Sequence, residues 1–480
     1  MKQVSVLPFR LFCLAFILAL LLPELMKDGM FADGVLYASV AHNEAKGFGS
    51  FWFPQFSQTV FLPFFHQQPP LTFGILSLFY RVFGDSIYVE RGYSLLCALV
   101  SALLLSGCWR LTYRGHPAGK SLSWLPVLFW IITPVCFYSY RNNLEENSLG
   151  VFTLLSLYFL LKGQENSNVM YDLFAALSIL LAMLCKGFPG LFPLAFPFLH
   201  WIIFRTSSLT KMLLHSARLC FLLILSVALL LLIPEARISL GAYVHDRVLN
   251  SIMNVDTGLG RFHLVVQLAA DLGVPAGILA LFLIILRSSG FRAPLFEKTS
   301  ARIGVLFILL GLCASLPLMI TREQRWFYPL ASLPAFAIGI ASFGVQPMQL
   351  IMERIRIRPK LVRILNYCAA GLLALTLGYT ITLYGKIRSE EEPDVSDSYI
   401  IGKALPPGTI LNTFPETYNN WSMQQYLSRY FSLSLTGEYP KMKYFLTDRS
   451  MNKRPGPEYQ KMDLPTSKYD LYKSIKTGNP

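Results

Sequence analysis

Long apolar runs alternate with short polar connections over most of the chain. Many of these runs approach the ~20 residues that a helix needs to cross a bilayer. The run at residues 71–84 is too short to cross, and Tyr80 and Arg81 interrupt its apolar face, which favours a helix lying in the membrane interface. About eleven spans are predicted, near residues 9–26, 88–109, 123–140, 148–162, 171–185, 188–204, 212–233, 265–286, 303–320, 327–344 and 364–384. This pattern predicts an all-α polytopic membrane protein.

The first apolar run has no small-residue cleavage site behind it. The residues that follow are Pro23-Glu24-Leu25-Met26-Lys27, which fit the pattern of a removed signal peptide poorly. We therefore expect residues 9–26 to be a retained first span.

The pattern changes near residue 385, where the chain becomes polar. An acidic linker, 390–394, precedes an amphipathic helix at 420–430 and short strands at 409–413, 432–436 and 443–447. The Lys-, Pro-, Ser- and Tyr-rich stretch 451–480 is expected to be partly disordered. We predict a transmembrane domain over 1–384, with a catalytic outer loop at 27–87, and a small α/β module over 385–480.

Composition supports a membrane protein, and the distribution of charge predicts its orientation. Only 15% of the 480 residues are charged and the mean hydropathy is +0.46, whereas about a quarter of residues are charged in soluble domains. The net charge of +14 arises largely from Lys and Arg between spans, as the positive-inside rule predicts, and we expect no nucleic-acid partner. The basic loops then face the cytoplasm together with the N-terminus. Loop 27–87, Glu145-Glu146 and the C-terminal module face outwards from the plasma (inner) membrane.

Cysteine and histidine spacing gives no indication of a metal centre. The eight cysteines lie in or beside apolar runs and form no CxxC pair, so we expect neither a disulfide framework nor a cysteine metal site. The outer histidines lack zinc-ligand spacing. No resident cofactor or metal is therefore predicted, although the sequence leaves a divalent ion open.

Carboxylates and cations gather in the outer loops. Asp33 follows the first span, Glu145 and Glu146 separate two later spans, Lys186 precedes Gly187-Phe188-Pro189, and Arg322 and Arg325 open the tenth span. A carboxylate can accept the proton of an attacking hydroxyl. Lys or Arg can stabilise the charge that develops on a phosphate leaving group. Together these groups suit a reaction between a hydroxyl and an anionic leaving group.

Each of these residues also has a purely structural interpretation. Asp33 can simply mark a membrane exit, and Glu145-Glu146 can be a solvated turn. Lys186 can snorkel to the interface. Arg322 and Arg325 can anchor to headgroups, but because they contradict the positive-inside pattern a functional role is favoured.

An ordered series of short motifs runs along the chain. It begins with Asp33-Gly34-Val35-Leu36-Tyr37-Ala38 and continues with His66-Gln67-Gln68-Pro69-Pro70-Leu71. The later motifs are Phe83-Gly84, Glu90-Arg91, Glu145/Glu146, Lys186-Gly187 and Arg325-Trp326-Phe327-Tyr328-Pro329. In content and order this series resembles the family-39-type membrane glycosyltransferases, which include protein O-mannosyltransferases and the aminoarabinose transferases of lipid A. The resemblance covers roughly residues 9–345.

The resemblance implies a GT-C fold that transfers a sugar from a polyprenyl-phosphate donor at the outer membrane face, by an inverting single displacement. The acceptor would be a hydroxyl or phosphate of a lipid, glycan or protein. By this analogy Asp33 is the catalytic carboxylate, and the second acidic position falls on Glu146 or, less well, on Glu145. The predicted substrate contacts are Glu145, Tyr37, His66, Gln68, Lys186, Arg322 and Arg325.

Two positions depart from the family pattern. Gly34 stands where many relatives carry a second acidic residue, and Gln68 stands where relatives often have lysine or histidine before the Pro-Pro pair. Gln68 can hydrogen-bond a phosphate but cannot neutralise it, so another cation must compensate.

Two other functions remain open at this level. A glycolipid or polyprenyl-lipid transporter would carry broken helices and polar groups near the bilayer midplane in corresponding halves, whereas the polar clusters here lie at span ends. A glycan ligase or polymerase would use a diphosphate-linked donor, and analysis of its product would distinguish it.

Overall fold

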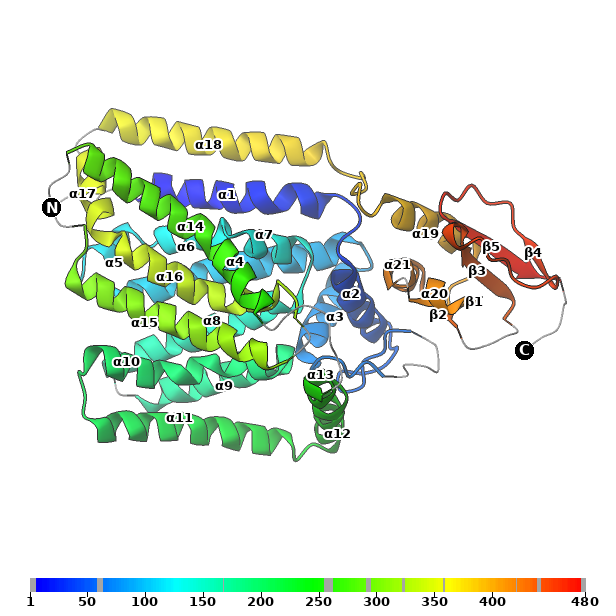
Figure 1. Cartoon of the computed structure of the whole chain (residues 1–480), viewed down its shortest axis with the longest axis horizontal. Coiled ribbons are helices and arrows are strands. Elements are labelled where there is room, and N and C mark those ends of the chain that lie inside the picture. The colour runs from blue at the N-terminus through cyan, green and yellow to red at the C-terminus, as the bar shows by residue number, and fades with distance from the viewer. Residues whose placement is uncertain are drawn as a thin grey trace.

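A computed structural model describes residues 6–57, 64–166, 168–253, 262–290, 295–321, 324–356, 359–419, 421–437 and 442–475. The molecule consists of a bundle of long helices with an α/β module beyond one end of it (Figure 1). We call this end of the bundle the module end. The polar clusters predicted to share one membrane face lie at the module end, as the following sections describe.

Seven of the predicted spans are long apolar helices within the described residues. Their length and composition fit a bilayer crossing, so the chain is a multi-pass membrane protein. They are α1 (Leu7–Met26), α4 (Tyr88–Thr112), α9 (Val169–Lys186), α11 (Leu209–Leu230), α14 (His263–Ser288), α15 (Lys298–Ser315) with η3 (Leu316–Ile320), and α18 (Pro359–Ile381).

The other four predicted spans consist of shorter helical pieces, except that 148–162 lies in the 22-residue helix α8, which bends sharply against α7. A proline lies at the start of most of the pieces, because it lacks an N–H to continue the preceding turn but fits the first turn of a new helix. The α7–α8 pair bends by 116° and the η4/α16–α17 pair by 65°. The pieces are α6 (Leu125–Ile131), α7 (Pro134–Arg141), α8 (Glu145–Asn166), η1 (Phe188–Ala195), α10 (Phe196–Phe204), η4 (Tyr328–Ser332), α16 (Leu333–Phe343) and α17 (Val345–Arg356). A further short helix, α5 (Ala118–Ser121), follows α4.

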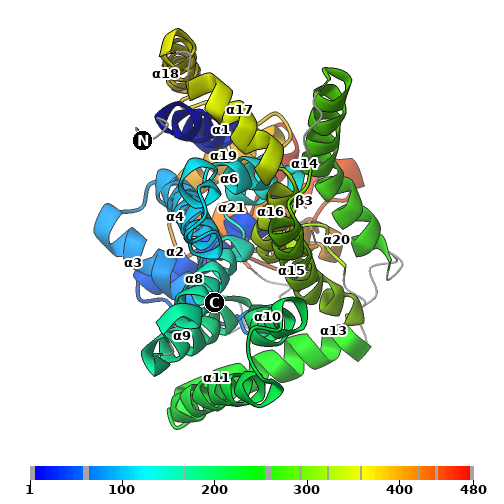
Figure 2. The ribbon, with the colours of Figure 1, turned by 90° about the vertical axis from the view of Figure 1, so that its left-hand side faces the viewer.

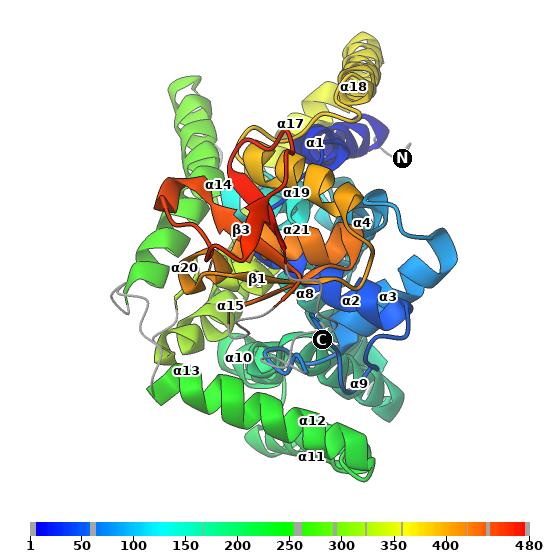
Figure 3. The same cartoon turned by 90° about the vertical axis from the view of Figure 1, so that its right-hand side faces the viewer.

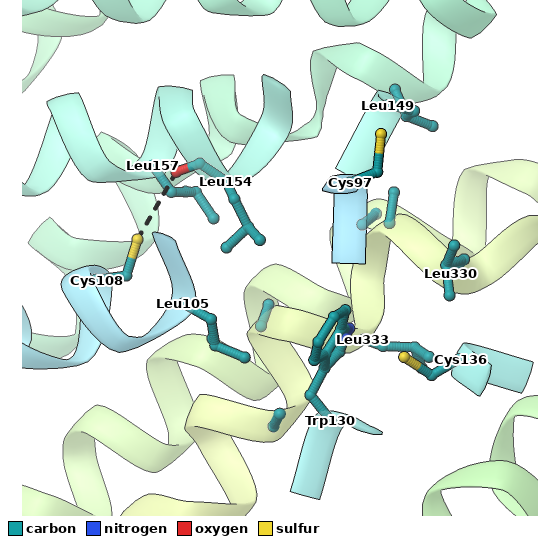
Figure 4. Close-up of a cluster of buried hydrophobic side chains, with 14 of the residues drawn as sticks. Cys97, Leu105, Cys108, Trp130, Cys136, Leu149, Leu154, Leu157, Leu330 and Leu333 are labelled. Atoms are coloured by element: carbon teal, nitrogen blue, oxygen red, sulfur yellow. Dashed lines mark hydrogen bonds between the residues drawn. The ribbon is translucent and has the colours of Figure 1, made fainter. Parts of the chain in front are cut away.

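The core of the bundle lies where α4, α6, α8 and α16 meet. Leu105, Trp130 and Leu154 are almost fully buried there, and the Cys108 thiol donates to the Leu154 carbonyl at 3.7 Å (Figure 4). By contrast α11, α14 and α18 lie at the rim of the bundle (Figure 2) and expose large apolar side chains such as Phe221 and Leu375. Apolar surface of this kind is expected where lipid is the solvent.

Short helices cover the module end of the bundle. They are α2 (Ala32–Ala45), α3 (Leu71–Phe83), α12 (Pro234–Ala242), the π-helical η2 (Tyr243–Leu249) and α13 (Asn250–Met253). The predicted amphipathic helix at 71–84 is α3, whose outward residues Leu78, Val82 and Phe83 are exposed. Viewed from the module end, the module lies over α2 while α12 and α13 lie to one side (Figure 3).

The module is a five-stranded sheet with helices packed on it. The strand order is β2-β1-β3-β5-β4, in which β1 runs parallel to β2 and β3 and the remaining pairs are antiparallel. Its elements are α19 (Glu392–Ala404), β1 (Ile410–Thr413), α20 (Pro415–Tyr418), α21 (Trp421–Phe431), β2 (Ser434–Thr436), β3 (Tyr444–Asp448), η5 (Arg449–Met451), β4 (Tyr459–Lys461) and β5 (Tyr469–Ser474).

The predicted strands and helix of the module are present, but the expectation of partial disorder after residue 451 is wrong for the two last strands. Strand β5 pairs with β3 and buries Tyr469 and Leu471 in the module core. The apolar positions buried on one face of β5 thus place it in the sheet, although the stretch as a whole is polar in composition. Residues 476–480 lie outside the described part of the chain.

Candidate active site

Asp33 lies in the first turn of α2, where the helix packs directly on the turn between α7 and α8. A Cβ atom added to Gly34 would overlap the backbone carbonyl of Asn142, so no side chain fits at this position. Asn142 Oδ1 accepts a hydrogen bond from the Phe31 backbone N–H at 3.0 Å. The close approach explains why this chain has glycine beside its candidate catalytic aspartate.

The α7–α8 turn leads directly into two buried carboxylates. Glu145 and Glu146 are both 0% exposed in the first turn of α8, and Lys186 is the last residue of α9. Lys186 Nζ lies 2.7 Å from Glu146 Oε1 and 3.6 Å from Glu145 Oε2. The alternative in which the two glutamates form a solvated turn is therefore wrong.

The helix ends favour this arrangement of charges, but they do not fully satisfy it. Carboxylates are stabilised at a helix N-terminus and an ammonium at a C-terminus, each by about 0.3–1 kcal/mol. Apart from these contacts with Lys186, no hydrogen bond to the carboxylate oxygens of Glu145 and Glu146 is found within the described residues. Because one ammonium faces two buried carboxylates, the cluster favours a further cation or proton donor.

Aromatic packing places the segment 325–329 beside the start of α2, next to this group of charges. The Phe327 ring is buried edge-on against Phe31, with ring centroids 5.8 Å apart, and Trp326 packs on Tyr138 of α7 at 4.3 Å. Phe31 lies two residues before Asp33. Packing of this segment therefore brings Arg325, which is exposed, towards the start of α2.

The electrostatic surroundings of Asp33 contain groups from five separate segments. Burial raises the pKa of Asp33, and Glu146 adds to that effect, while Lys186, Arg325 and Arg247 oppose it. Burial also raises the pKa of Tyr37, one turn further along α2, with Glu145 and Asp33 contributing. The Tyr37 hydroxyl therefore stays protonated at neutral pH. Asp33, Tyr37, Glu145, Glu146, Lys186 and Arg325 thus belong to one electrostatic cluster, as the sequence predicts.

A cavity of about 520 Å³ adjoins this cluster. Most of its wall is apolar, formed by η1, the end of α15 and η3, including Phe188, Phe192 and Pro317. Its polar lining consists of Gln68, Lys186, Tyr243, Arg247, Ser251, Thr321 and Tyr328. A mostly apolar lining that includes two cations suits an amphiphile with an anionic head.

The structure adds Tyr243 and Arg247 to the residues that the sequence suggested. Gly187 has a φ of +74°, and an added Cβ would collide with the Tyr243 side chain, so η2 approaches α9 closely at this glycine. The Tyr243 hydroxyl donates to the Lys186 carbonyl at 3.3 Å. Arg247 lies one helical turn further along the chain. The signal that singled out Arg325, a cation on the side poor in Lys and Arg, also applies to Arg247.

Three predicted contacts have different outcomes. Gln68 lines the cavity. His66 lies outside its lining and packs near the rings of Phe53 and Phe64, with Nδ1 3.5 Å from Ser239 Oγ of α12, and burial lowers its pKa. Arg322 lies outside the described residues.

Comparison with known proteins agrees with this fold. The sequence profile of the dolichyl-phosphate-mannose-protein mannosyltransferase family matches residues 67–231. The crystal structure of ArnT from Cupriavidus metallidurans bound to undecaprenyl phosphate is similar over 98% of this chain and 99% of that chain, with a TM-score of 0.66 at 15% identity.

The apo structure of the same ArnT is similar over 97% of both chains, with a TM-score of 0.63 at 14% identity. None of the curated protein sequences matches this chain. At such low identity the likeness concerns the fold. The chain therefore has the GT-C fold of the membrane glycosyltransferases that its motifs resemble.

Proposed function

We propose that this protein is a membrane glycosyltransferase that transfers a sugar, with inversion, from a polyprenyl-phosphate donor to an acceptor hydroxyl or phosphate. The observation that carries the proposal is the mostly apolar cavity whose lining includes Lys186 and Arg247, two cations that act on Asp33. A donor of this kind has an apolar chain, a phosphate and a sugar. The apolar lining suits the chain, the two cations suit the phosphate, and the adjoining carboxylate suits the reacting sugar.

The likeness to a protein crystallised with undecaprenyl phosphate supports the donor class. The phosphate of the donor would bind Lys186 and Arg247, with Arg325 and Gln68 as further contacts. Arg247 supplies the compensating cation that the replacement of a basic residue by Gln68 requires. Tyr37 and Glu145 would act from behind the cavity wall, through Asp33 and Lys186. His66 and Arg322 remain predicted contacts of the loops around the site.

In the proposed reaction the acceptor oxygen attacks the anomeric carbon from the side opposite the phosphate. The new glycosidic C–O bond forms as the bond to the phosphate oxygen breaks, which inverts the anomeric centre. Asp33 accepts the proton of an acceptor hydroxyl, and Lys186 and Arg247 stabilise the departing phosphate dianion. Glu146 holds the Lys186 ammonium through the 2.7 Å ion pair and thereby orients it.

We further propose that the module end faces outwards from the plasma membrane, with the N-terminus in the cytoplasm. The distribution of Lys and Arg supports this orientation. The acceptor class is then an outer-envelope lipid, glycan or protein.

The test is sugar transfer in proteoliposomes containing polyprenyl-phosphate donors, with products identified by mass spectrometry. Comparing envelope lipids and glycoproteins from cells with and without the protein identifies the sugar and the acceptor. Asp33→Asn is expected to abolish transfer while leaving insertion and the unfolding temperature unchanged. Full transfer by this variant would refute the assignment of Asp33. Lipid movement without a glycosidic product would instead indicate a transporter, and a diphosphate-linked donor would indicate a ligase or polymerase.

A further inference from the structure

The segment just before α2 is held by the C-terminal module. Residues 28–31 connect the first span to the helix that carries Asp33. The Asp28 backbone N–H donates to the Lys386 carbonyl at 2.8 Å, and the Arg388 N–H donates to the Asp28 carbonyl at 2.9 Å. The chain entering α2 is thereby paired with the chain entering the module.

The Asp28 side chain is a second point of attachment. Its carboxylate accepts hydrogen bonds from the Tyr430 hydroxyl at 2.6 Å and the Tyr399 hydroxyl at 2.7 Å, both from the module. It also accepts from the Gly29 backbone N–H at 2.6 Å and lies 3.4 Å from an Arg91 nitrogen. Asp28 is 6% exposed, so these contacts satisfy a buried charge.

Gly29 and Met30 are held by two further module residues. The Tyr426 hydroxyl oxygen lies 3.0 Å from the Met30 backbone nitrogen and 2.9 Å from its carbonyl oxygen. A Cβ atom on Gly29, whose φ is +83°, would lie 2.9 Å from the Cβ of Glu391. Both backbone groups of Met30, only three residues before Asp33, therefore contact one module hydroxyl.

Arg388 links this attachment to the other side of the site. It donates to Asn142 Oδ1 at 2.7 Å and to the Arg141 carbonyl at 2.9 Å. Asn142 Oδ1 is the same atom that accepts from the Phe31 N–H. One arginine at the entrance to the module thus fixes both the start of α2 and the turn that leads into Glu145 and Glu146.

We propose that the C-terminal module is a positioning element of the active site, in which Tyr426, Tyr430, Tyr399 and Arg388 hold Asp33 at the cavity through residues 28–31. The proposal rests on the proposed glycosyl transfer and assigns to the module a role in the chemical step. These four residues are positioning residues, since they contact the segment that precedes α2 and not the cavity. A displacement of about 1 Å in a reacting group is enough to cost roughly a hundredfold in rate.

The test uses Tyr426→Phe in the full-length protein, because this change removes one hydroxyl and keeps the ring. Tyr469→Phe is the matched control. Tyr469 is also a buried module tyrosine whose hydroxyl donates to a carboxylate, Asp394 at 2.7 Å, but it does not contact residues 28–31. Hydrogen–deuterium exchange of peptides covering residues 26–40 reports directly on the attachment. Steady-state transfer rates report on its consequence.

Tyr426→Phe is expected to increase exchange in residues 26–40, and to lower kcat roughly tenfold or more with little change in the donor KM. Tyr469→Phe is expected to change neither quantity. The double variant Tyr426→Phe/Tyr430→Phe should enlarge both effects. Unchanged exchange and unchanged kcat in the double variant would overturn the proposal.

The exchange measurement does not depend on catalysis. If exchange rises in Tyr426→Phe but even the wild-type protein transfers no sugar, the attachment stands and the proposed function fails. If the wild-type protein is active and the tyrosine variants lose stability in step with kcat at every temperature, the module is only a structural support. That result would also overturn the positioning role.

Discussion

Two groups of charged side chains, all buried except the partly buried Asp33, differ in how their charges are satisfied. The first, which we call the clamp cluster, consists of Asp28, Glu90, Arg91 and Arg429. The second, which we call the site cluster, consists of Asp33, Glu145, Glu146 and Lys186. Both are formed at the module end, and each joins segments that are distant in the chain.

The clamp cluster is densely hydrogen-bonded. Glu90 Oε2 accepts from Arg429 at 2.9 Å and from the Tyr80 hydroxyl at 2.8 Å, and Arg429 also donates to the carbonyls of Asp85 and Ser86 at 3.2 Å. The glutamates of the site cluster share one lysine and have no further hydrogen-bond partner among the described residues. The site cluster also adjoins the cavity, because Lys186 lines it.

This difference in hydrogen bonding distinguishes charged groups that stabilise the fold from charged groups that can act on a substrate. The clamp cluster joins the module to the bundle, and the carboxylates of Asp28 and Glu90 are occupied by hydrogen bonds, although Arg91 Nε has no hydrogen-bond partner among the described residues. An incompletely satisfied network costs folding free energy, and it retains capacity to interact with a ligand. Buried charge alone would not have distinguished the two clusters.

The largest effect is expected when the site cluster loses its cation. Lys186→Met leaves Glu145 and Glu146 buried without an ammonium and removes a cation from the donor phosphate. We expect transfer to fall about 10³-fold and the free energy of unfolding to fall by about 3–5 kcal/mol. Donor turnover in proteoliposomes and thermal unfolding measure the two effects. Lys162→Met is the control, since Lys162 lies over the Tyr158 ring, away from the site, and wild-type turnover in Lys186→Met would refute the role of Lys186.

The clamp cluster should respond chiefly in stability. Arg429→Gln leaves Glu90 without its closest cation, and breaking a buried pair costs about 3–5 kcal/mol. Arg449→Gln is the matched module variant, because Arg449 pairs with Asp470 at 2.7 Å while 38% exposed, and such pairs contribute about 0–1 kcal/mol. Thermal unfolding of the full-length protein compares them. Equal losses in the two variants would contradict the assignment of Arg429 to a buried, densely hydrogen-bonded network.

Within the site cluster, Asp33 is joined to the two glutamates by the packing of α2 on the α7–α8 turn. Gly34→Ala is expected to push the start of α2 from the Asn142 carbonyl and to lower kcat roughly tenfold or more, because Asp33 moves with the helix. Gly92→Ala in α4 is the control, since an added Cβ there meets nothing within 4 Å. Alanine should be neutral or stabilising by up to about 1 kcal/mol at that helical position. A fully active Gly34→Ala variant would show that the close approach is not needed.

The smallest expected effect is a shift of the pH profile. Because burial raises the pKa of Asp33, the reactive carboxylate is lost as pH falls through a value above its ordinary one, and kcat/KM falls with it. The stability contribution has the opposite sign: the folded state binds this proton more tightly, so the contribution is present at low pH and lost as pH rises through the raised pKa. Arg325→Gln removes a cation that opposes the shift. The acid limb of kcat/KM should therefore move to higher pH, and a shift to lower pH would contradict the arrangement.

Much of the site could be predicted because residue type and position relative to the apolar runs are local properties of the sequence. Asp33, Glu146, Lys186 and Arg325 were selected by residue type at the ends of apolar runs, and the alternation of those runs placed them on one side. The order of the motifs then indicated the fold. The sequence could not define the environment of these groups: Glu145-Glu146 fitted a solvated turn equally well, whereas both are buried, and His66, still a predicted contact, lies outside the cavity lining.

Only the tertiary structure decided which of these charged groups lie together and which have their hydrogen bonds and ion pairs completed. The apolar pattern by itself determined a multi-pass helical protein. The length of an apolar run is a local property of the sequence, and the thickness of the bilayer core sets the length that a spanning helix needs. In the sequence Gly34 is only a departure from the family pattern, and its reason becomes clear from the close approach of Asn142. Arg247 is placed in the site by the packing of η2 on Gly187. The module's contacts with residues 28–31 join positions nearly 400 residues apart. Periodicity cannot specify such contacts, because they depend on how completed elements pack together.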